Sequence, residues 1–148
     1  MTQKIFVIED DENILYGLQD RFTSDGYDVD ISNADEELDT IVSRIREFRP
    51  NFLVLDLLLP KHEGLEIVKR LKNDDELSDV QVFVFTDLSD EDSRSRSVGL
   101  GVNYYFLKSD LDVNEFADKV EGLIKGEQIE EVAEREEEEE GGDDLVLE

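Results

Sequence analysis

Five polar or charged side chains stand at or just after the ends of apolar runs in this sequence. Three are carboxylates, one is a hydroxyl and one is an ammonium: Glu9, Asp10, Asp56, Thr86 and Lys108. Two carboxylates about 5 Å apart repel each other by roughly 3 kcal/mol at an effective dielectric constant near 20. A hard divalent cation such as Mg2+ removes that repulsion, because it binds carboxylate oxygens and keeps several waters. If the three acids meet, they can form a Mg2+ site.

The same residue types are suited to holding a phosphoryl group. Beside a bound Mg2+, the carboxylate of Asp56 is a competent nucleophile toward phosphorus. The ammonium of Lys108 can neutralise one phosphoryl oxygen, and the hydroxyl of Thr86 can donate a hydrogen bond to another. The chemistry that this set predicts is the acceptance of a phosphoryl group on Asp56 as an acyl phosphate.

These side chains can meet only if the preceding strands lie side by side. Continuous apolar runs at 5–8 and 52–55 predict strands that are buried on both faces. Three further segments have strand patterns, at 27–31, 80–85 and 103–107. Apolar residues at helical spacing and a weaker polar segment predict helices at 14–24, 38–48, 64–71, 90–98 and 112–125.

Strand and helix therefore alternate five times. This order predicts an α/β fold, a (βα)5 doubly wound five-stranded parallel sheet with helices on both faces. Sheets of this kind bind ligands outside the carboxyl ends of their strands. The five polar residues stand at those ends, so we expect them to share one edge of the sheet.

Length and charge limit the classes of function. The chain has 148 residues and a formal net charge of −26, which suits one domain with an acidic surface. Nucleic acid and anionic membranes bind proteins through Lys and Arg, so we expect neither as a partner. The sequence contains no cysteine and no 18-residue apolar run. A cytoplasmic location is the expectation that follows.

The acidity is concentrated near the end of the chain. From Glu127 onward there are twelve acidic residues and one basic residue, Arg135. Such charge runs are typical of solvated chain without a packed core. We therefore expect one domain at residues 1–125 and a flexible acidic tail at 126–148.

Over residues 4–125 the sequence resembles the receiver domain of two-component response regulators, which have the flavodoxin-like fold of chemotaxis regulators. Residues 6–11, FVIEDD, are similar to the family's first-strand acidic motif, and LVLDLLLP at 53–60 resembles its phosphoacceptor strand and loop. Gly64 completes the Pro-x-x-x-Gly pattern of that loop. The threonine and the lysine of the set follow Asp56 at the spacings that the family leads one to expect.

The resemblance implies a role for each residue of the set. Asp56 would be the phosphoacceptor, and Thr86 and Lys108 would contact the phosphoryl group. The implied Mg2+ ligands are Glu9, Asp10, Asp56 and the backbone carbonyl of Leu58. Spacing alone leaves open whether Glu9 or Asp11 faces the metal, and the family position favours Glu9.

The resemblance also implies a switch and partners. Tyr105 stands where the family often carries an aromatic switch residue, and it would rotate inward when phosphorylation draws the hydroxyl of Thr86 toward the phosphoryl group. A sensor histidine kinase or a phosphotransfer protein would supply that group. A downstream protein would bind the face formed by 90–98, 103–107 and 112–125. No output domain follows within these residues, so we expect a single-domain regulator that catalyses only its own phosphorylation and dephosphorylation.

Three positions depart from the family pattern. Ser109 replaces the usual proline, Asp87 replaces a small residue, and His62-Glu63 stands where Met-Asp is common. Two alternative functions stay open. The chain could be a degenerate receiver that serves as a scaffold, or a phosphohydrolase of the haloacid-dehalogenase type. The second needs an Asp two residues after its nucleophile, and this sequence has Leu58 there.

Overall fold

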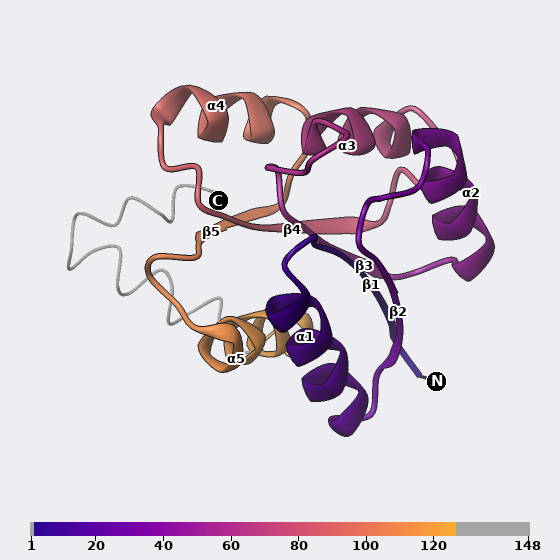
Figure 1. Cartoon of the computed structure of the whole chain (residues 1–148). Coiled ribbons are helices and arrows are strands. Elements are labelled where there is room, and N and C mark those ends of the chain that lie inside the picture. Colours follow the sequence, from indigo (N-terminus) through magenta and orange to yellow (C-terminus); the bar gives the residue numbers. More distant parts are fainter. Residues whose placement is uncertain (1, 127–148) are drawn as a thin grey trace.

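The computed structural model describes residues 2–126, so the expected acidic tail lies outside the described residues except for Gly126. Five strands and five helices alternate along the chain (Figure 1). The strands are β1 (Lys4–Ile8), β2 (Asp28–Ser32), β3 (Phe52–Leu55), β4 (Gln81–Thr86) and β5 (Tyr104–Leu107). The helices are α1 (Glu12–Ser24), α2 (Leu38–Phe48), α3 (Gly64–Lys72), α4 (Glu91–Gly99) and α5 (Val113–Lys125).

The strands form one parallel sheet in the order β2-β1-β3-β4-β5. This arrangement confirms the (βα)5 doubly wound fold that the alternation of patterns predicts. The strand order reverses between β1 and β3, where Ile8 pairs with Leu55. The carboxyl ends of these two strands therefore lie beside each other at the switch point, which is where sheets of this type bind ligands.

Helices cover both faces of the sheet. In Figure 1, α2, α3 and α4 lie on one side of the sheet and α1 and α5 lie on the other. Alternate residues of each strand point to opposite faces, so β1 buries Phe6 and Ile8 in one core and Ile5 and Val7 in the other. Burial on both faces explains why β1 and β3 are continuous apolar runs rather than alternating ones.

The helices differ in how they are anchored. The side chain of Asp112 opens α5 with a capping box, and Asp90 caps α4 by accepting a hydrogen bond from the backbone N–H of Ser93. In α4 the buried residue is Ser97, whereas the other helices bury apolar side chains against the sheet. None of the helices within residues 2–126 is long and apolar enough to cross a membrane.

Candidate functional site

The backbone at the carboxyl edge fixes two of the candidate residues. The amide of Asp56 donates to the carbonyl oxygen of Ile8 at 3.1 Å, and the amide of Lys108 donates to that of Thr86 at 2.8 Å. Each bond continues the parallel ladder one step beyond the last paired residues. The sheet therefore holds the backbone of the expected nucleophile and of its expected cationic partner in register with the neighbouring strands.

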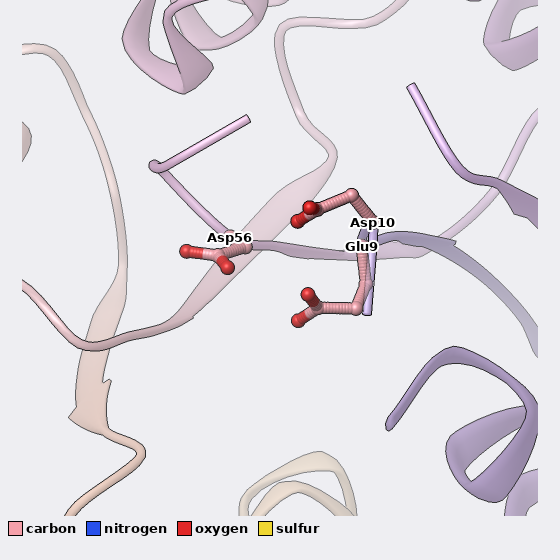
Figure 2. A group of neighbouring side chains, drawn as sticks. All are labelled: Glu9, Asp10 and Asp56. Atoms are coloured by element: carbon pink, nitrogen blue, oxygen red, sulfur yellow. The ribbon is translucent and has the colours of Figure 1, made fainter. Parts of the chain in front are cut away.

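Three carboxylates converge at this edge. Glu9, Asp10 and Asp56 each bring one oxygen into a group whose members all lie within 4.8 Å of one another (Figure 2). Glu9 and Asp56 are 2% and 4% exposed, whereas Asp10 is exposed. The side chain of Asp11 points elsewhere, because it caps α1 by accepting from the backbone N–H groups of Asn13 and Ile14. The structure thus places Glu9, rather than Asp11, beside Asp56.

The ammonium of Lys108 contacts two of these acids. Its Nζ lies 2.8 Å from Oδ2 of Asp56 and 3.0 Å from Oε1 of Glu9. Burial lowers the pKa of Lys108, but the hydrogen bonds to Asp56 and Glu9 outweigh it, and the net pKa is raised. Lys108 therefore stays charged, and it offers one positive charge to a group of three acids.

Burial also changes the ionisation of Glu9. Desolvation raises the pKa of Glu9 to about 7, and the negative charge of Asp56 adds to the increase. The hydrogen bonds from the amide of Asp11 and the ammonium of Lys108 act in the opposite direction. Glu9 thus retains a proton close to neutral pH when no further cation compensates the cluster.

The donor set fits a hard divalent cation. All three side chains offer carboxylate oxygens, which are the ligands that Mg2+ prefers. One ammonium cannot balance three carboxylates, and the exposed position of Asp10 leaves one side of the group accessible to solvent. The geometry therefore provides an acidic metal-binding group on the edge of the sheet.

The loop after β3 is held close to this group. The backbone N–H of Leu58 donates to Oδ1 of Asp56 at 3.1 Å, and a Cβ added to Gly64 would lie 2.6 Å from Cα of Leu57. A side chain at position 64 would therefore force the loop to move. His62, one of the departures from the family pattern, lies with Nε2 2.7 Å from the carbonyl oxygen of Glu36. This contact joins the loop after β3 to the loop after β2.

The two expected switch residues meet through Leu88. The backbone N–H of Leu88 donates to Oγ1 of Thr86 at 3.4 Å, and the hydroxyl of Tyr105 donates to the carbonyl oxygen of Leu88 at 2.8 Å. Tyr105 is 2% exposed, and burial raises its pKa to about 12. In this structure the ring therefore already lies inward, without the rotation that was expected to follow phosphorylation.

Sequence reasoning missed one neighbour of this pair. The guanidinium of Arg94 lies over the ring of Tyr105. Arg94 belongs to a polar helical segment without an apolar stripe, so nothing in the local pattern distinguishes it from a solvated arginine. Another departure from the family pattern, Asp87, is exposed at the end of β4.

Known proteins resemble this chain over most of its length. The family described as "Response regulator receiver domain" matches residues 5–137. A probable transcriptional regulator, ycf27 of Porphyridium aerugineum, is 38% identical over 106 residues, which are 72% of this chain and 42% of that protein. Sporulation initiation phosphotransferase F of Bacillus subtilis is 30% identical over 125 residues, covering 84% of this chain and 95% of that one. The chain thus spans less than half of the first relative and nearly all of the second.

The fold also matches solved structures. The phosphorylated cyanobacterial phytochrome response regulator RcpA is 26% identical and superimposes with a TM-score of 0.69. The match covers 83% of this chain and 91% of that structure. The similarity therefore extends over almost the whole of the described domain.

Proposed function

Because the chain belongs to the response regulator receiver domain family of two-component signalling, we propose that it is a phosphorylation switch with Asp56 as its phosphoacceptor. The donor in this proposal is the phosphohistidine of a sensor histidine kinase or a phosphotransfer protein. Receiver domains are not conventional enzymes, and the chemistry proposed for this chain is limited to its own phosphorylation and dephosphorylation.

One observation carries the proposal. Asp56 lies at the switch point of the sheet, 2.8 Å from the ammonium of Lys108 and within the group of three carboxylates. A buried carboxylate in contact with a lysine is compatible with a structural ion pair. The two further acids, Glu9 and Asp10, favour a metal site instead. A simple ion pair does not need them, whereas a divalent cation that orients a phosphoryl group needs several carboxylate ligands.

The proposed step uses residues of the chain in separate roles. One carboxylate oxygen of Asp56 forms a bond to phosphorus while the P–N bond of the donor breaks, and the electron pair stays on the imidazole. Lys108 moves from pairing the carboxylate to pairing a phosphoryl oxygen, and Thr86 donates a hydrogen bond to another. Bound Mg2+, held by Glu9, Asp10, Asp56 and the backbone carbonyl of Leu58, would supply neutralisation of phosphoryl charge.

The output of the proposed switch is a protein contact. We assign the downstream partner to the face formed by α4, β5 and α5. Phosphorylation would act on this face by drawing Thr86 toward the phosphoryl group and stabilising the inward position of Tyr105. The expectation of a single-domain regulator stays a prediction, since relatives such as the Porphyridium protein extend far beyond the matched segment. We expect the protein to act in the cytoplasm, because histidine kinases present their phosphohistidine there.

Two relatives support the proposal. The Bacillus protein is named a phosphotransferase, and this chain spans nearly its whole length. The cyanobacterial regulator, which this chain matches with 26% identity, has been solved in a phosphorylated form. Two proteins that resemble this chain are thus described by phosphoryl chemistry, which supports the same chemistry here.

Intact-mass measurement of the full chain tests the proposal. With Mg2+ and the small phosphodonor phosphoramidate, we expect an adduct of one HPO3 group, and we expect none with EDTA or in the Asp56→Asn variant. An unchanged mass in the wild type, with any donor, would favour the scaffold alternative. Continuous release of phosphate from phosphate esters would favour the phosphohydrolase, and an adduct on another residue of the variant would contradict Asp56.

A further inference from the structure

Two contacts from different elements hold the ring of Tyr105. The hydroxyl donates to the carbonyl oxygen of Leu88, in the loop between β4 and α4, at 2.8 Å. On the ring face, the central guanidinium carbon of Arg94 in α4 lies 4.9 Å from the ring centroid. A cation at this distance is attracted to the negative face of an aromatic ring. The inward position of Tyr105 is thus supported from the loop and from α4 together.

The hydrogen-bonding state of Arg94 is unusual. Its Nη1 atom is buried and has no hydrogen-bond partner among the described residues. Buried donors are normally paired, because an unpaired one loses its hydration without compensation. A surface arginine free to choose its position would turn this nitrogen toward water. Its burial is explained if contact with the ring of Tyr105 determines where the guanidinium lies.

The rest of α4 provides little other attachment to the sheet. Its sequence is EDSRSRSVG, its buried residue is Ser97, and Val98 is 45% exposed. The nine-residue helix α3, of the same length, buries Leu65, Ile67, Val68 and Leu71 in the core. α4 lacks such an apolar stripe. The contact between Arg94 and the ring of Tyr105 therefore makes up a large share of the packing that holds α4 against β5.

We propose that Arg94 is a positioning residue, whose positive charge over the ring face stabilises the inward position of Tyr105 and so ties α4 to β5. Its consequence for signalling rests on the proposed function, because the affected face is the one assigned to the downstream partner. Loss of the stack would release the ring and α4 together. The partner-binding face would then change although nothing at Asp56 had been altered.

Ring NMR of the full chain tests this proposal directly. Selective 13C labelling of the tyrosine rings gives four signals, and the Tyr105→Phe variant identifies the one from Tyr105. We compare Arg94→Met, which keeps much of the apolar volume but removes the charge, with Arg94→Lys, which keeps the charge. Arg96→Met is the matched control, because Arg96 lies exposed on the same helix.

The proposal predicts a clear order of effects. In Arg94→Met the Tyr105 signal should move toward the shift of an exposed tyrosine, with at least a severalfold increase in the outward population. Arg94→Lys should retain most of the wild-type shift, and Arg96→Met all of it. An unmoved signal in Arg94→Met would overturn the proposal. So would equal displacement in the Met and Lys variants, because it would mean that the shape of arginine, rather than its charge, holds the ring.

Beryllofluoride separates this proposal from the proposed function. With Mg2+ present, it should bind beside Asp56 and return the ring of the Arg94→Met variant to the wild-type shift. If 19F NMR shows no bound beryllofluoride in the wild type, the proposed function fails. The comparison of Arg94 variants without beryllofluoride is unaffected by that result and still decides the role of Arg94.

Discussion

Two clusters within residues 2–126 each bring three acidic side chains together around one cation. One lies at the carboxyl edge of the sheet, and the other lies between α1 and α5. We call the first the edge cluster, with Glu9, Asp10, Asp56 and Lys108, and the second the helix cluster, with Asp25, Asp118, Glu121 and Arg21. The two have the same number of acids and cations, yet we assign phosphoryl chemistry only to the first.

The cation accounts for part of the difference. In the helix cluster, Nε of Arg21 lies 2.7 Å from Asp25, and Nη2 lies 2.7 Å from Asp118 and 3.7 Å from Glu121. The planar fork of an arginine satisfies several carboxylates at once and keeps them spread around it. Lysine is a compact charge on a flexible stem. In the edge cluster it can therefore exchange a carboxylate for a phosphoryl oxygen without taking the group apart.

The backbone accounts for the rest. The acids of the edge cluster follow two adjacent strand ends. Within residues 2–126 they form the one group of three acids in which one oxygen of each lies within 4.8 Å of the others. In the helix cluster, Asp25 follows the C-terminal end of α1, Asp118 and Glu121 belong to α5, and an arginine of α1 lies between them. The comparison teaches that the number of carboxylates does not define a metal site, whereas their convergence on one point does.

A raised pKa does not distinguish the two clusters. Burial raises the pKa of Glu9 to about 7, and burial, with a hydrogen bond to Asp25, raises that of Glu121 to about 7. In the helix cluster the pKa of Asp25 is lowered, first by its interaction with Glu121 and then by its hydrogen bond with Arg21. A perturbed carboxyl is thus found in a structural ion-pair network as well as in the proposed site.

The largest expected effect is on phosphorylation, which should depend on the edge cluster and not on the helix cluster. Asp56→Asn should abolish phosphorylation, because an amide keeps the shape of the side chain but is not a nucleophile. Asp118→Asn, in the helix cluster, should be phosphorylated like the wild type. Intact mass after incubation with Mg2+ and phosphoramidate measures both. Equal loss in the two variants would mean that the comparison has no functional meaning.

The second prediction tests dependence on the backbone. A Cβ at position 64 would lie 2.6 Å from Cα of Leu57 and 2.8 Å from the carbonyl oxygen of Asp56, so Gly64→Ala should displace the loop that carries Asp56. We expect a loss of about 1–3 kcal/mol in the free energy of unfolding and much slower phosphorylation. Gly99→Ala is the matched control, because a Cβ there meets nothing within 4 Å. Urea denaturation and phosphorylation rates would show whether only the first variant is impaired.

The third prediction concerns metal affinity. Asp10→Ala removes one ionised ligand from the edge cluster, so the Kd for Mg2+ should rise roughly tenfold or more. Asp118→Ala removes the same charge from the helix cluster and should leave the Kd nearly unchanged. Titration calorimetry with Mg2+ measures both. Similar affinities in the two variants would show that overall charge, rather than the convergence of the acids, sets metal binding.

The smallest expected effect concerns pH. The carboxyl of Glu121 ionises near pH 4.5 in the unfolded chain and near 7 in the folded one, so the folded state holds an extra proton between these values. The free energy of unfolding must therefore fall as pH rises through this window, and the loss is complete above it. Glu121→Gln removes this dependence. We compare the free energy of unfolding of the variant with that of the wild type at each pH. The difference, variant minus wild type, should be about 1–2 kcal/mol larger at pH 8 than at pH 5.

Urea denaturation of both proteins at the two pH values, in metal-free buffer, gives the comparison. Glu9 titrates in the same window in each protein, so its contribution cancels. Parallel pH profiles for the wild type and the variant would show that Glu121 is ionised in the folded protein at neutral pH, contrary to this account.

The sequence determined the fold and most of the polar residues at the carboxyl edge of the sheet. Continuous apolar runs mark strands that are buried on both faces, and helical spacing marks the helices between them, because side-chain period and burial are local properties of the chain. The carboxyl ends of parallel strands lie on one edge, so the residue after each run could be assigned to the edge. Asp56, Thr86 and Lys108 were identified in this way, without knowledge of any long-range contact.

Tertiary structure alone decided which side chains make contact. Periodicity does not distinguish Glu9 from Asp11, because both flank Asp10, and the cap that Asp11 gives α1 settles the difference. It also does not predict that Arg94 lies on the ring of Tyr105, or that Arg21 joins α1 to α5. The position of a long polar side chain depends on the surface that it meets, and residues far away in the sequence supply that surface.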